Sequence, residues 1–307
     1  MEMNRRRLLS AGAMLGLASA LDWPKASAGI LAPRVLGLQL FTVMVPLEQD
    51  FAGTLQAVAK IGYKEVETIG SFGRDPREVR EMLDRCGLVS PSQHLVPGDL
   101  YDVFNAFTQR RMSQDEIHKK WLAVMSVDRV AAIIDEGISR ARILGQKYLV
   151  WQIIWPEQLA TRDVMDKFCR AMNVAGDACA KAGLVFNFHN HSVEFKSVNG
   201  YVPYDVLVEN TDPQTVKLEL DVYWAVAAQA DPVAYFDRYP GRYRQCHLKD
   251  GDAQGNLARA GAGVVDFPAV LKAAKRAGVK HYYFEYDRSD DPMAAARESF
   301  SYLRKYF

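Results

Sequence analysis

FNFHNH at Phe186–His191, KLELD at Lys217–Asp221, YRQCHLKD at Tyr243–Asp250 and HYYFEYD at His281–Asp287 are the four stretches that decide the fold. In each, a strand-like apolar run stops at a residue of a type that binds metals in proteins: His189, Asp221, His247 and Glu285. These residues follow one another at intervals of 32, 26 and 38 positions, which is typical of repeated strand–helix units. Because a parallel β/α barrel gathers the C-terminal ends of its strands around one pocket, we expect the four side chains to meet there.

The four expected ligands also indicate the class of cofactor. Two imidazoles and two carboxylates suit one divalent metal ion; Mn, Co, Zn and Mg are the candidates, and the imidazoles argue against Mg alone. His191 lies on the same face of its strand as His189, because strand side chains alternate. The pattern therefore predicts a metal-dependent enzyme and leaves open whether His189 or His191 is the ligand on that strand.

Size and charge limit the classes of protein that the chain can belong to. Its 307 residues are enough for one large domain or two small ones, and 49% of them are hydrophobic, which is ample for a core. The formal net charge is +1, and no basic block occurs outside the N-terminus. The signature of nucleic-acid binding is therefore missing, and we expect no nucleic-acid partner.

The N-terminal residues have the features of an export signal. A twin arginine within Arg5–Arg7 precedes a weakly apolar stretch from Leu8 to Leu21, and Ala26–Ala28 is a small-residue cleavage site. These features predict a Tat-type signal peptide over residues 1–28 that is cleaved after export to the periplasm. The alternative is an uncleaved membrane anchor, but the apolar run is short for a bilayer span. We therefore expect no stable membrane anchoring.

The rest of the chain alternates strands and helices. Strands are expected at residues 35–42, 65–69, 88–94, 147–154, 184–188, 215–221, 243–248 and 281–285. Helices are expected at residues 50–61, 76–86, 127–144, 162–181, 203–210, 232–239, 267–277 and 292–306. Eight such units predict an α/β fold, a single-domain (β/α)8 TIM barrel over residues 29–307. The alternative is an open doubly wound sheet, which often has a glycine-rich first turn that residues 39–46 lack.

Two further features of the chain have more than one interpretation. Residues 97–126 form an insertion that is far longer than an ordinary strand–helix connection. This aromatic and basic segment is either a lid over the pocket or a surface excursion with a helix of its own. The four cysteines do not suggest a disulfide framework, although a bridge between Cys86 and Cys246 stays open.

The same stretches carry a family likeness. LGLQLFTV at the first strand, IGYKEVE at the second, FHNHSVEF at the fifth, LELDVYW at the sixth, HLKD at the seventh and FEYD at the eighth resemble the sugar phosphate isomerase/epimerase family of xylose isomerase-like TIM barrels. The likeness runs from about residue 35 to residue 307. It implies a divalent-metal barrel that acts on a small-molecule carbohydrate or polyol. Barrels of this family often pair, so the resemblance leaves a homodimer open.

The resemblance assigns the expected ligands position by position. Asp221, His247 and Glu285 match the family's metal ligands on strands six, seven and eight. Ketose epimerases have a glutamate on strand five, where this chain has His189. In those epimerases the glutamates of strands five and eight are the two bases. The histidine therefore puts a symmetric epimerisation by two carboxylates in doubt.

Further residues near the strand ends are expected to act on the substrate. The expected catalytic residues are Glu285 as a base that is also a ligand, His191 as a base or substrate contact, Lys249 as a contact to a substrate oxygen, and Glu67 as a proton carrier. The expected substrate-binding residues are His94, Trp151, Gln152 and Trp224. The plainer alternatives are salt bridges for Glu67 and Lys249, a structural hydrogen bond for His191, and core packing for the aromatic residues and His94.

These expectations lead to a class of reaction. We expect proton abstraction next to a carbonyl of a free sugar or sugar derivative, with an enediolate intermediate. Reprotonation then gives an isomerase or epimerase, which is the function predicted first, whereas loss of a neighbouring substituent gives a lyase or dehydratase on keto-sugars or 3-keto-glycosides. The alternative from another class is a non-catalytic periplasmic barrel that binds carbohydrate.

Overall fold

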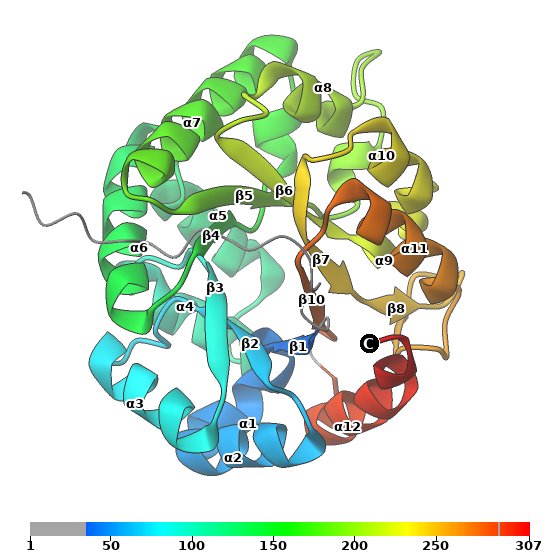
Figure 1. The fold of residues 1–307 in the computed structure, drawn as a ribbon. Coiled ribbons are helices and arrows are strands. Elements are labelled where there is room, and N and C mark those ends of the chain that lie inside the picture. Colours follow the sequence, from blue (N-terminus) through cyan, green and yellow to red (C-terminus); the bar gives the residue numbers. More distant parts are fainter. Residues whose placement is uncertain (1–34, 288) are drawn as a thin grey trace, which may run out of the picture. The chain divides into compact units, whose positions relative to one another are not determined.

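Eight parallel strands close into a barrel within the described residues (Figure 1). The computed structural model describes residues 35–287 and 289–307, so the predicted signal peptide at residues 1–28 and the expected domain start at residue 29 lie outside them. The strands are β1 (Leu36–Gln39), β2 (Glu65–Ile69), β3 (Val89–His94), β4 (Tyr148–Trp151), β5 (Val185–His189), β6 (Val216–Asp221), β7 (Tyr243–Leu248) and β10 (His281–Phe284). Their order β1-β10-β7-β6-β5-β4-β3-β2 confirms the predicted TIM barrel and excludes the open sheet.

Helices surround the barrel as an outer layer. The larger ones are α2 (Phe51–Ile61), α3 (Pro76–Cys86), α6 (Val130–Leu144), α7 (Arg162–Lys181), α8 (Pro203–Asn210), α10 (Pro232–Arg238), α11 (Phe267–Ala277) and α12 (Pro292–Leu303). Most begin at a residue whose side chain caps the first turn, as Asp266 does by accepting the N–H of Ala269 at 3.0 Å. Gly278 then ends α11 in the left-handed conformation that favours glycine. None of the described helices is both long and apolar enough to span a membrane.

Several element boundaries differ from the expected ones for local reasons. β1 ends at Gln39 because the Gln39 side chain accepts the N–H of Phe41 and starts a 3-10 turn over Leu40–Val43. The expected helix at residues 127–144 begins as a 3-10 turn, Val127–Arg129. Short elements that the pattern did not predict are α1 (Met44–Gln49), α9 (Val222–Ala227) and the strand pair β8 (Asp250–Gly251) and β9 (Leu257–Ala258). All four cysteines are free, so the Cys86–Cys246 bridge is absent.

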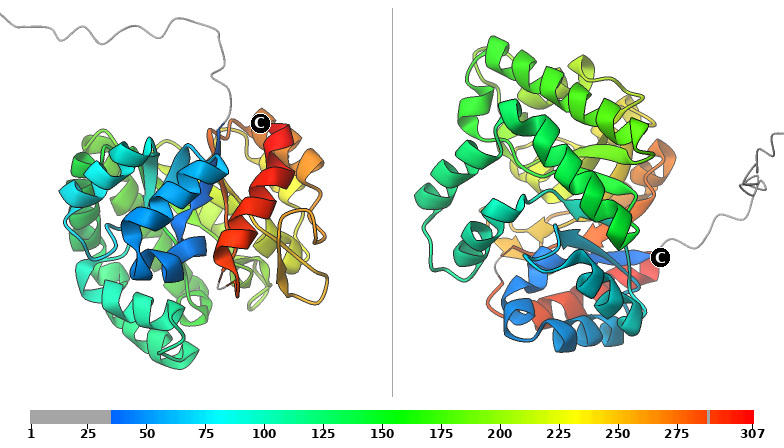
Figure 2. Two further views of the ribbon diagram at one scale, coloured as in Figure 1. Left: turned by 90° about the horizontal axis from the view of Figure 1, so that it is seen from below. Right: turned by 90° about the vertical axis from the view of Figure 1, so that its left-hand side faces the viewer.

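The insertion at residues 97–126 forms two helices, α4 (Gly98–Thr108) and α5 (Gln114–Val124). A capping box between Ser113 and Glu116 starts α5. The two helices project from one end of the barrel, and the C-terminus lies at the other end (Figure 2). The strand register places neighbouring polar residues side by side, with His189 of β5 beside Glu219 of β6 and Asp221 beside His247.

Candidate metal centre and active site

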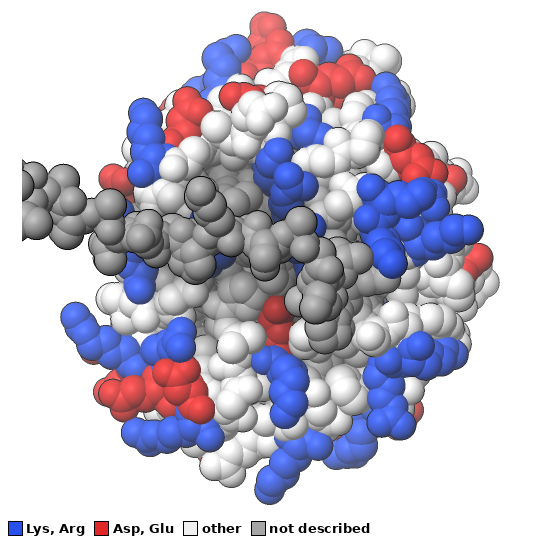
Figure 3. Space-filling view, viewed as in Figure 1, with Lys and Arg blue, Asp and Glu red and all other residues white. Residues whose placement is uncertain are grey.

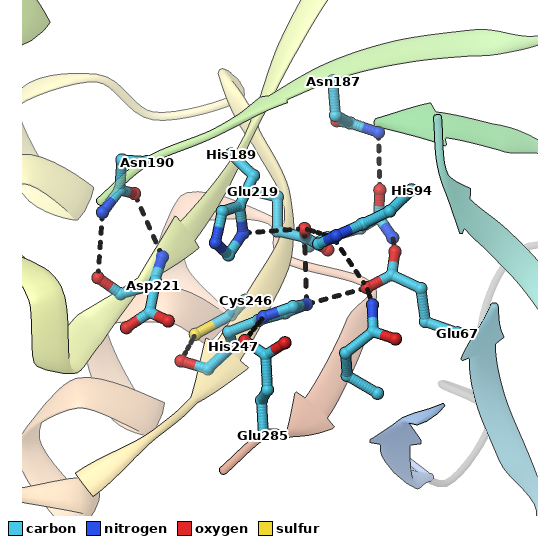
Figure 4. Close-up of polar contacts among 12 residues, drawn as sticks. Glu67, His94, Asn187, His189, Asn190, Glu219, Asp221, Cys246, His247 and Glu285 are labelled. Atoms are coloured by element: carbon cyan, nitrogen blue, oxygen red, sulfur yellow. Dashed lines mark hydrogen bonds and ion pairs between the residues drawn. The ribbon is translucent and has the colours of Figure 1, made fainter. Parts of the chain in front are cut away.

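Four polar side chains meet at the C-terminal ends of neighbouring strands (Figure 4). They come from β5, β6, β7 and the residue that follows β10: His189, Asp221, His247 and Glu285. One ligand atom of each lies within 4.8 Å of those of the others, and none of these residues is more than 4% exposed. The structure therefore brings together the four residues for which the sequence predicts a shared metal ion.

A second group of metal-binding residue types shares two members with the first. It consists of His94, His189, Glu219 and His247, whose ligand atoms also lie within 4.8 Å of one another. Here Glu219 Oε2 already lies 3.0 Å from His94 Nε2 and from His189 Nδ1. The same oxygen lies 3.3 Å from His247 Nε2. A carboxylate oxygen among three imidazoles occupies the space that a cation would need, so the geometry favours the first group.

A buried carboxylate stands behind each imidazole of the first group. Glu219 contacts Nδ1 of His189, which leaves Nε2 of that ring for an ion. Glu67 Oε2 lies 2.7 Å from His247 Nε2, and Nδ1 of the same ring faces Glu285 Oε2 at 2.9 Å. Histidine ligands usually pair their second ring nitrogen with a carboxylate, which fixes the ring and raises its basicity. The donor set and its supporting carboxylates therefore fit a divalent ion.

Local backbone contacts fix the position of Asp221. Its Oδ1 accepts the N–H of Trp224 at 3.1 Å and caps helix α9. Asn190 binds the backbone of Asp221 twice, accepting its N–H at 3.0 Å and donating to its C=O at 3.2 Å. With Oδ1 held by the cap, Oδ2 is the oxygen that can bind a metal ion, and Lys249 Nζ lies 3.1 Å from it.

Burial and neighbouring charges set the protonation states of the group. Burial holds the pKa of His189 well below its usual value, and the nearby His247 and His94 lower it further. Burial alone would raise the pKa of Glu285, but Lys249 and His247 keep it well below its usual value. Burial would lower the pKa of His247, but Glu219 and Glu285 raise it well above its usual value. His189 and Glu285 therefore have the neutral and ionised forms that bind metal ions, whereas the His247 ring must lose a proton when an ion binds.

Lys249 lies beside this group but does not line the pocket. It is 1% exposed and forms ion pairs with Asp221 at 3.1 Å, Glu285 at 2.8 Å and Asp287 at 2.9 Å. Burial would lower its pKa, yet the three carboxylates raise it well above the usual value. Because an ammonium group has three N–H donors, these partners use its full capacity. The structure therefore contradicts the predicted contact of Lys249 with the substrate and favours a positioning role.

Glu67 is enclosed rather than exposed to a substrate. It is fully buried in the middle of β2, where its carboxylate accepts hydrogen bonds from Gln39 at 2.7 Å, Gln245 at 3.2 Å and Ser92. His247 contacts it as well. Glu67 does not itself line the pocket, and it reaches the pocket only through His94, whose Nε2 lies 3.2 Å from Glu67 Oε2. A role of Glu67 in carrying a proton to or from the substrate stays a prediction. Its contact with His247 makes it a positioning residue.

A cavity of about 620 Å³ opens above the group. Strand-end residues that line it are His94, Gln152, His189, His191, Glu285 and Asp287. The insertion supplies a second wall, which includes Phe104, Phe107, Ile117, His118 and Trp121. The insertion therefore combines both interpretations, since it has helices of its own and these helices cover the pocket. Whether it moves as a lid stays a prediction.

The expected substrate-binding residues divide into two groups. His94, Gln152 and Trp224 line the pocket, and the Oε1 atom of Gln152 has no hydrogen-bond partner among the described residues. Trp151 does not line it: the side chain is fully buried with its ring edge-on to Phe168 of α7. The structure therefore does not place Trp151, which was expected to bind the substrate, in the pocket, because this ring packs against the helical layer.

The two pocket histidines His94 and His191 differ in charge. Burial alone would lower the pKa of His94, but Glu67 and Glu219 raise it to about 9. Burial lowers the pKa of His191 to about 3, with Lys249 acting in the same direction. A ring with so low a pKa is a weak base, so the structure favours substrate contact over proton abstraction for His191. Its Nδ1 has no hydrogen-bond partner among the described residues.

Sequence reasoning did not single out two other acidic residues. Asp287 lines the pocket two positions after Glu285, and burial raises its pKa to about 6 despite the nearby Lys249. Lys249 follows the expected ligand His247 by two positions, and Asp287 follows Glu285 by two. This shared spacing could have been used to predict that Asp287 lies near the site. Glu194 is 1% exposed and accepts the N–H of His191 at 2.9 Å. Glu194 lies in a loop, and the sequence pattern there does not indicate a buried side chain.

Glu194 leads to a prediction about stability. Burial raises its pKa to about 8, so the folded protein binds a proton there more tightly than the unfolded chain, whose glutamate pKa is about 4.3. The stabilisation is complete below about pH 4.3 and is lost as the pH rises towards 8. Glu194→Gln keeps an acceptor for His191 and removes the titration. We expect this variant to be more stable than the parent at pH 8.5 by on the order of a few kcal/mol, with little difference at pH 5.

Urea unfolding of the metal-free protein across this pH range measures the effect. Glu78→Gln, at an exposed position of α3, is the matched control and should leave the pH dependence unchanged. Parallel pH profiles for the parent and Glu194→Gln would show that Glu194 is ionised in the folded protein.

The charges on one outer face are mixed in sign. Lys and Arg side chains are interspersed with Asp and Glu around the perimeter of the face in Figure 3. The perimeter of this face therefore lacks the continuous basic surface that is typical of nucleic-acid-binding proteins.

Comparison with known proteins identifies the family. The family model described as "Xylose isomerase-like TIM barrel" matches residues 55–306. The chain belongs to this family. The resemblance inferred from the strand-end motifs is thus confirmed, and among relatives of this xylose isomerase-like barrel are proteins named for both expected reaction types.

Three proteins to which the chain is similar differ in their named reactions. Inosose dehydratase of Lacticaseibacillus casei is 22% identical over 282 residues, which are 84% of this chain and 89% of that protein. A sugar phosphate isomerase/epimerase of Parabacteroides distasonis is 27% identical with a TM-score of 0.72, covering 89% of this chain and 98% of that one. The probable 3-DHS dehydratase of Bacillus anthracis shares the fold at 10% identity with a TM-score of 0.65, covering 88% and 98%.

Proposed function

We propose that this xylose isomerase-like barrel is a metal-dependent lyase or dehydratase. In this proposal it removes a proton next to a carbonyl of a sugar derivative, and the substituent on the neighbouring carbon leaves. The observation that carries the proposal is the buried set of His189, Asp221, His247 and Glu285, with a carboxylate behind each imidazole. A divalent ion at this set would act as a Lewis acid on the substrate carbonyl and lower the pKa of the adjacent C–H.

Glu285 is the side chain best suited to take the proton. It lines the pocket, and its described contacts with His247 and Lys249 both use Oε2. Oε1 is therefore the oxygen that faces a substrate. Because its neighbours keep the pKa of Glu285 well below its usual value, the carboxylate is ionised at neutral pH and ready to accept a proton.

The residue at the end of strand five favours elimination over symmetric epimerisation. Epimerisation by two matched carboxylates needs a second base of the same kind on the other side of the substrate. The chain has His189 at that position, and its Nδ1 is already engaged by Glu219. Elimination needs one base and a group that protonates what leaves, and Asp287, with a pKa of about 6, is an acid within the same pocket. The likeness to inosose dehydratases supports this choice.

An isomerase or epimerase is the second candidate. Asp287 also favours this second candidate. A carboxylate in the pocket, two residues from Glu285, can return a proton to the substrate as well as supply one to a leaving group. The likeness to the Parabacteroides distasonis isomerase/epimerase supports the same alternative. Both candidates begin with the same proton abstraction and differ in the fate of the resulting intermediate, which is either reprotonated or loses a substituent.

The pocket also informs the substrate class. Among the described residues that line it there is no lysine or arginine, and these are the side chains that usually bind phosphate. We therefore propose an unphosphorylated carbohydrate derivative as the substrate. This agrees with the proposed location in the periplasm after removal of residues 1–28, where phosphorylated intermediates are not expected.

Deuterium exchange tests this proposal. The protein, loaded with Mn, is incubated in heavy water with 3-keto-glucose and with methyl 3-keto-glucoside, and the products are read by NMR and mass spectrometry. We expect loss of methanol from the glycoside, with deuterium next to the carbonyl only in the recovered substrate, because the elimination product has no hydrogen on that carbon. Label without loss of a substituent would favour the isomerase or epimerase. Binding without label or turnover would support a carbohydrate-binding barrel and contradict the proposal.

A further inference from the structure

One wall of the pocket is aromatic and apolar, in contrast to its polar floor of strand-end residues. This aromatic wall consists of Phe104, Phe107, Ile117, Trp121, Trp155 and Trp224. Four of these residues come from the insertion helices α4 and α5, which close over the strand ends. The rings contact one another, with Phe104 and Trp121 at 5.6 Å between centroids, and Phe104 also stacks on Phe41 at 5.2 Å.

The pocket is larger than a single sugar requires. Its volume of about 620 Å³ lies in the range that holds a drug-sized ligand. A hexose bound at the polar floor would leave the space beside the aromatic wall to water. Water against so many apolar side chains is unfavourable, so this wall is suited to a second, apolar part of the ligand.

Three indole N–H groups in the wall have no partner. The Nε1 atoms of Trp121, Trp155 and Trp224 are buried and form no hydrogen bond within the part of the chain that the structure describes. Trp121 is only 3% exposed, so solvent does not satisfy its donor. Buried tryptophan N–H groups normally find an acceptor. Because these three nitrogen atoms are shielded from solvent, the wall presents apolar ring surface to a ligand rather than hydrogen-bond donors.

The balance of donors and acceptors distinguishes between two kinds of second ring. Each hydroxyl of a sugar donates one hydrogen bond, and the six residues of the aromatic wall have no side-chain acceptor. An aromatic ring places no hydroxyl donor against the wall, and its faces stack on Phe and Trp. We propose that the substrate is an aryl glycoside derivative, with its sugar at the strand-end floor and its aromatic group against the aromatic wall. This inference deepens the proposed function and rests on it.

Binding of three unoxidised glycosides tests the inference separately from catalysis. Isothermal titration calorimetry of the full metal-loaded protein compares 4-nitrophenyl glucoside, methyl glucoside and cellobiose. We expect 4-nitrophenyl glucoside to bind at least about tenfold more tightly than methyl glucoside, and cellobiose to gain no such advantage. Equal affinities for the aryl and methyl glucosides would overturn the inference. Preference for cellobiose would also overturn it, in favour of a second sugar ring.

Variants of the wall give a second measurement. The quantity is the ratio of the affinities for 4-nitrophenyl and methyl glucoside, so a general loss of folding does not imitate the effect. We expect Phe104→Ala and Trp121→Ala each to lower this ratio about tenfold, because each removes a ring from the wall. Lys120→Ala, exposed on the same helix as Trp121, is the control and should leave the ratio unchanged.

The outcome separates the two proposals. If deuterium exchange fails while the aryl preference is found, the proposed reaction is wrong and the aromatic site stands. If exchange into methyl 3-keto-glucoside succeeds while wall variants leave the affinity ratio unchanged, the reaction stands and the aryl assignment is wrong.

Discussion

Replacement of His247 with alanine is expected to remove the bound divalent ion and nearly all turnover. The His247 ring lies between Glu285 at 2.9 Å and Glu67 at 2.7 Å, and it is fully buried. Loss of a carboxylate behind a ligand usually costs 10–100-fold in metal affinity, so loss of the ligand itself should cost at least roughly 100-fold. Without the ion, the rate of proton removal should fall by about a thousandfold or more.

Metal analysis by mass spectrometry and deuterium exchange measure these two effects. His281→Ala is the matched control, because His281 lies on β10 only four positions before Glu285 but at the start of that strand, where it pairs with Glu65 at 2.8 Å. It should keep the metal and the exchange rate. Glu67→Gln should fall between the two variants, with metal affinity lowered about 10–100-fold. A His247→Ala protein with full metal content would contradict the ligand assignment.

Replacement of Lys249 with methionine is expected to destabilise the metal-free protein strongly and the metal-loaded protein less. Lys249 is 1% exposed and neutralises Asp221, Glu285 and Asp287. Removal of one partner of a buried ion pair typically costs about 3–5 kcal/mol, because the other charge is left unpaired. For a domain of this size that corresponds to a fall of the melting temperature of roughly 6–10 °C.

A bound divalent ion should reduce this loss. The ion would neutralise Asp221 and Glu285, so that only Asp287 stays unpaired in the variant. Thermal unfolding with a chelator and with excess Mn measures the difference, and Lys272→Met, at an exposed position of α11, is the control. Equal destabilisation with and without metal would show that Lys249 and the ion do not share the same carboxylates.

The strand ends could be predicted because each leaves a local mark in the sequence. Asp221, for example, closes an apolar run, and an acidic residue in that position is costly to bury unless it meets a partner. The helices α3, α7 and α11 begin and end where the pattern predicts, since their caps and glycines act within one turn. Helix α8 also matches, and it begins with Pro203 in its first turn. Barrel closure then results from the repeated units, which brings the expected ligands together.

The direction and partners of individual side chains could not be predicted in the same way. Trp151 ends the short strand β4, and which way it faces depends on how all eight strands tilt and stagger, which no local pattern records. The role of Lys249 depends on Asp287, 38 positions later. Glu67 is enclosed because Gln39 and Ser92 lie on adjacent strands. These contacts arise from register between distant segments rather than from the residues themselves.

The measurement that tests the central claim most directly is the position of the ion in a crystal of the full metal-loaded protein. Anomalous scattering at the absorption edge of Mn locates the ion without reference to any assumed ligand. The account predicts one peak at coordination distance from His189, Asp221, His247 and Glu285. A peak at the second group, between His94 and Glu219 and away from Asp221 and Glu285, would contradict it. The absence of any peak in protein that turns over substrate would also contradict it.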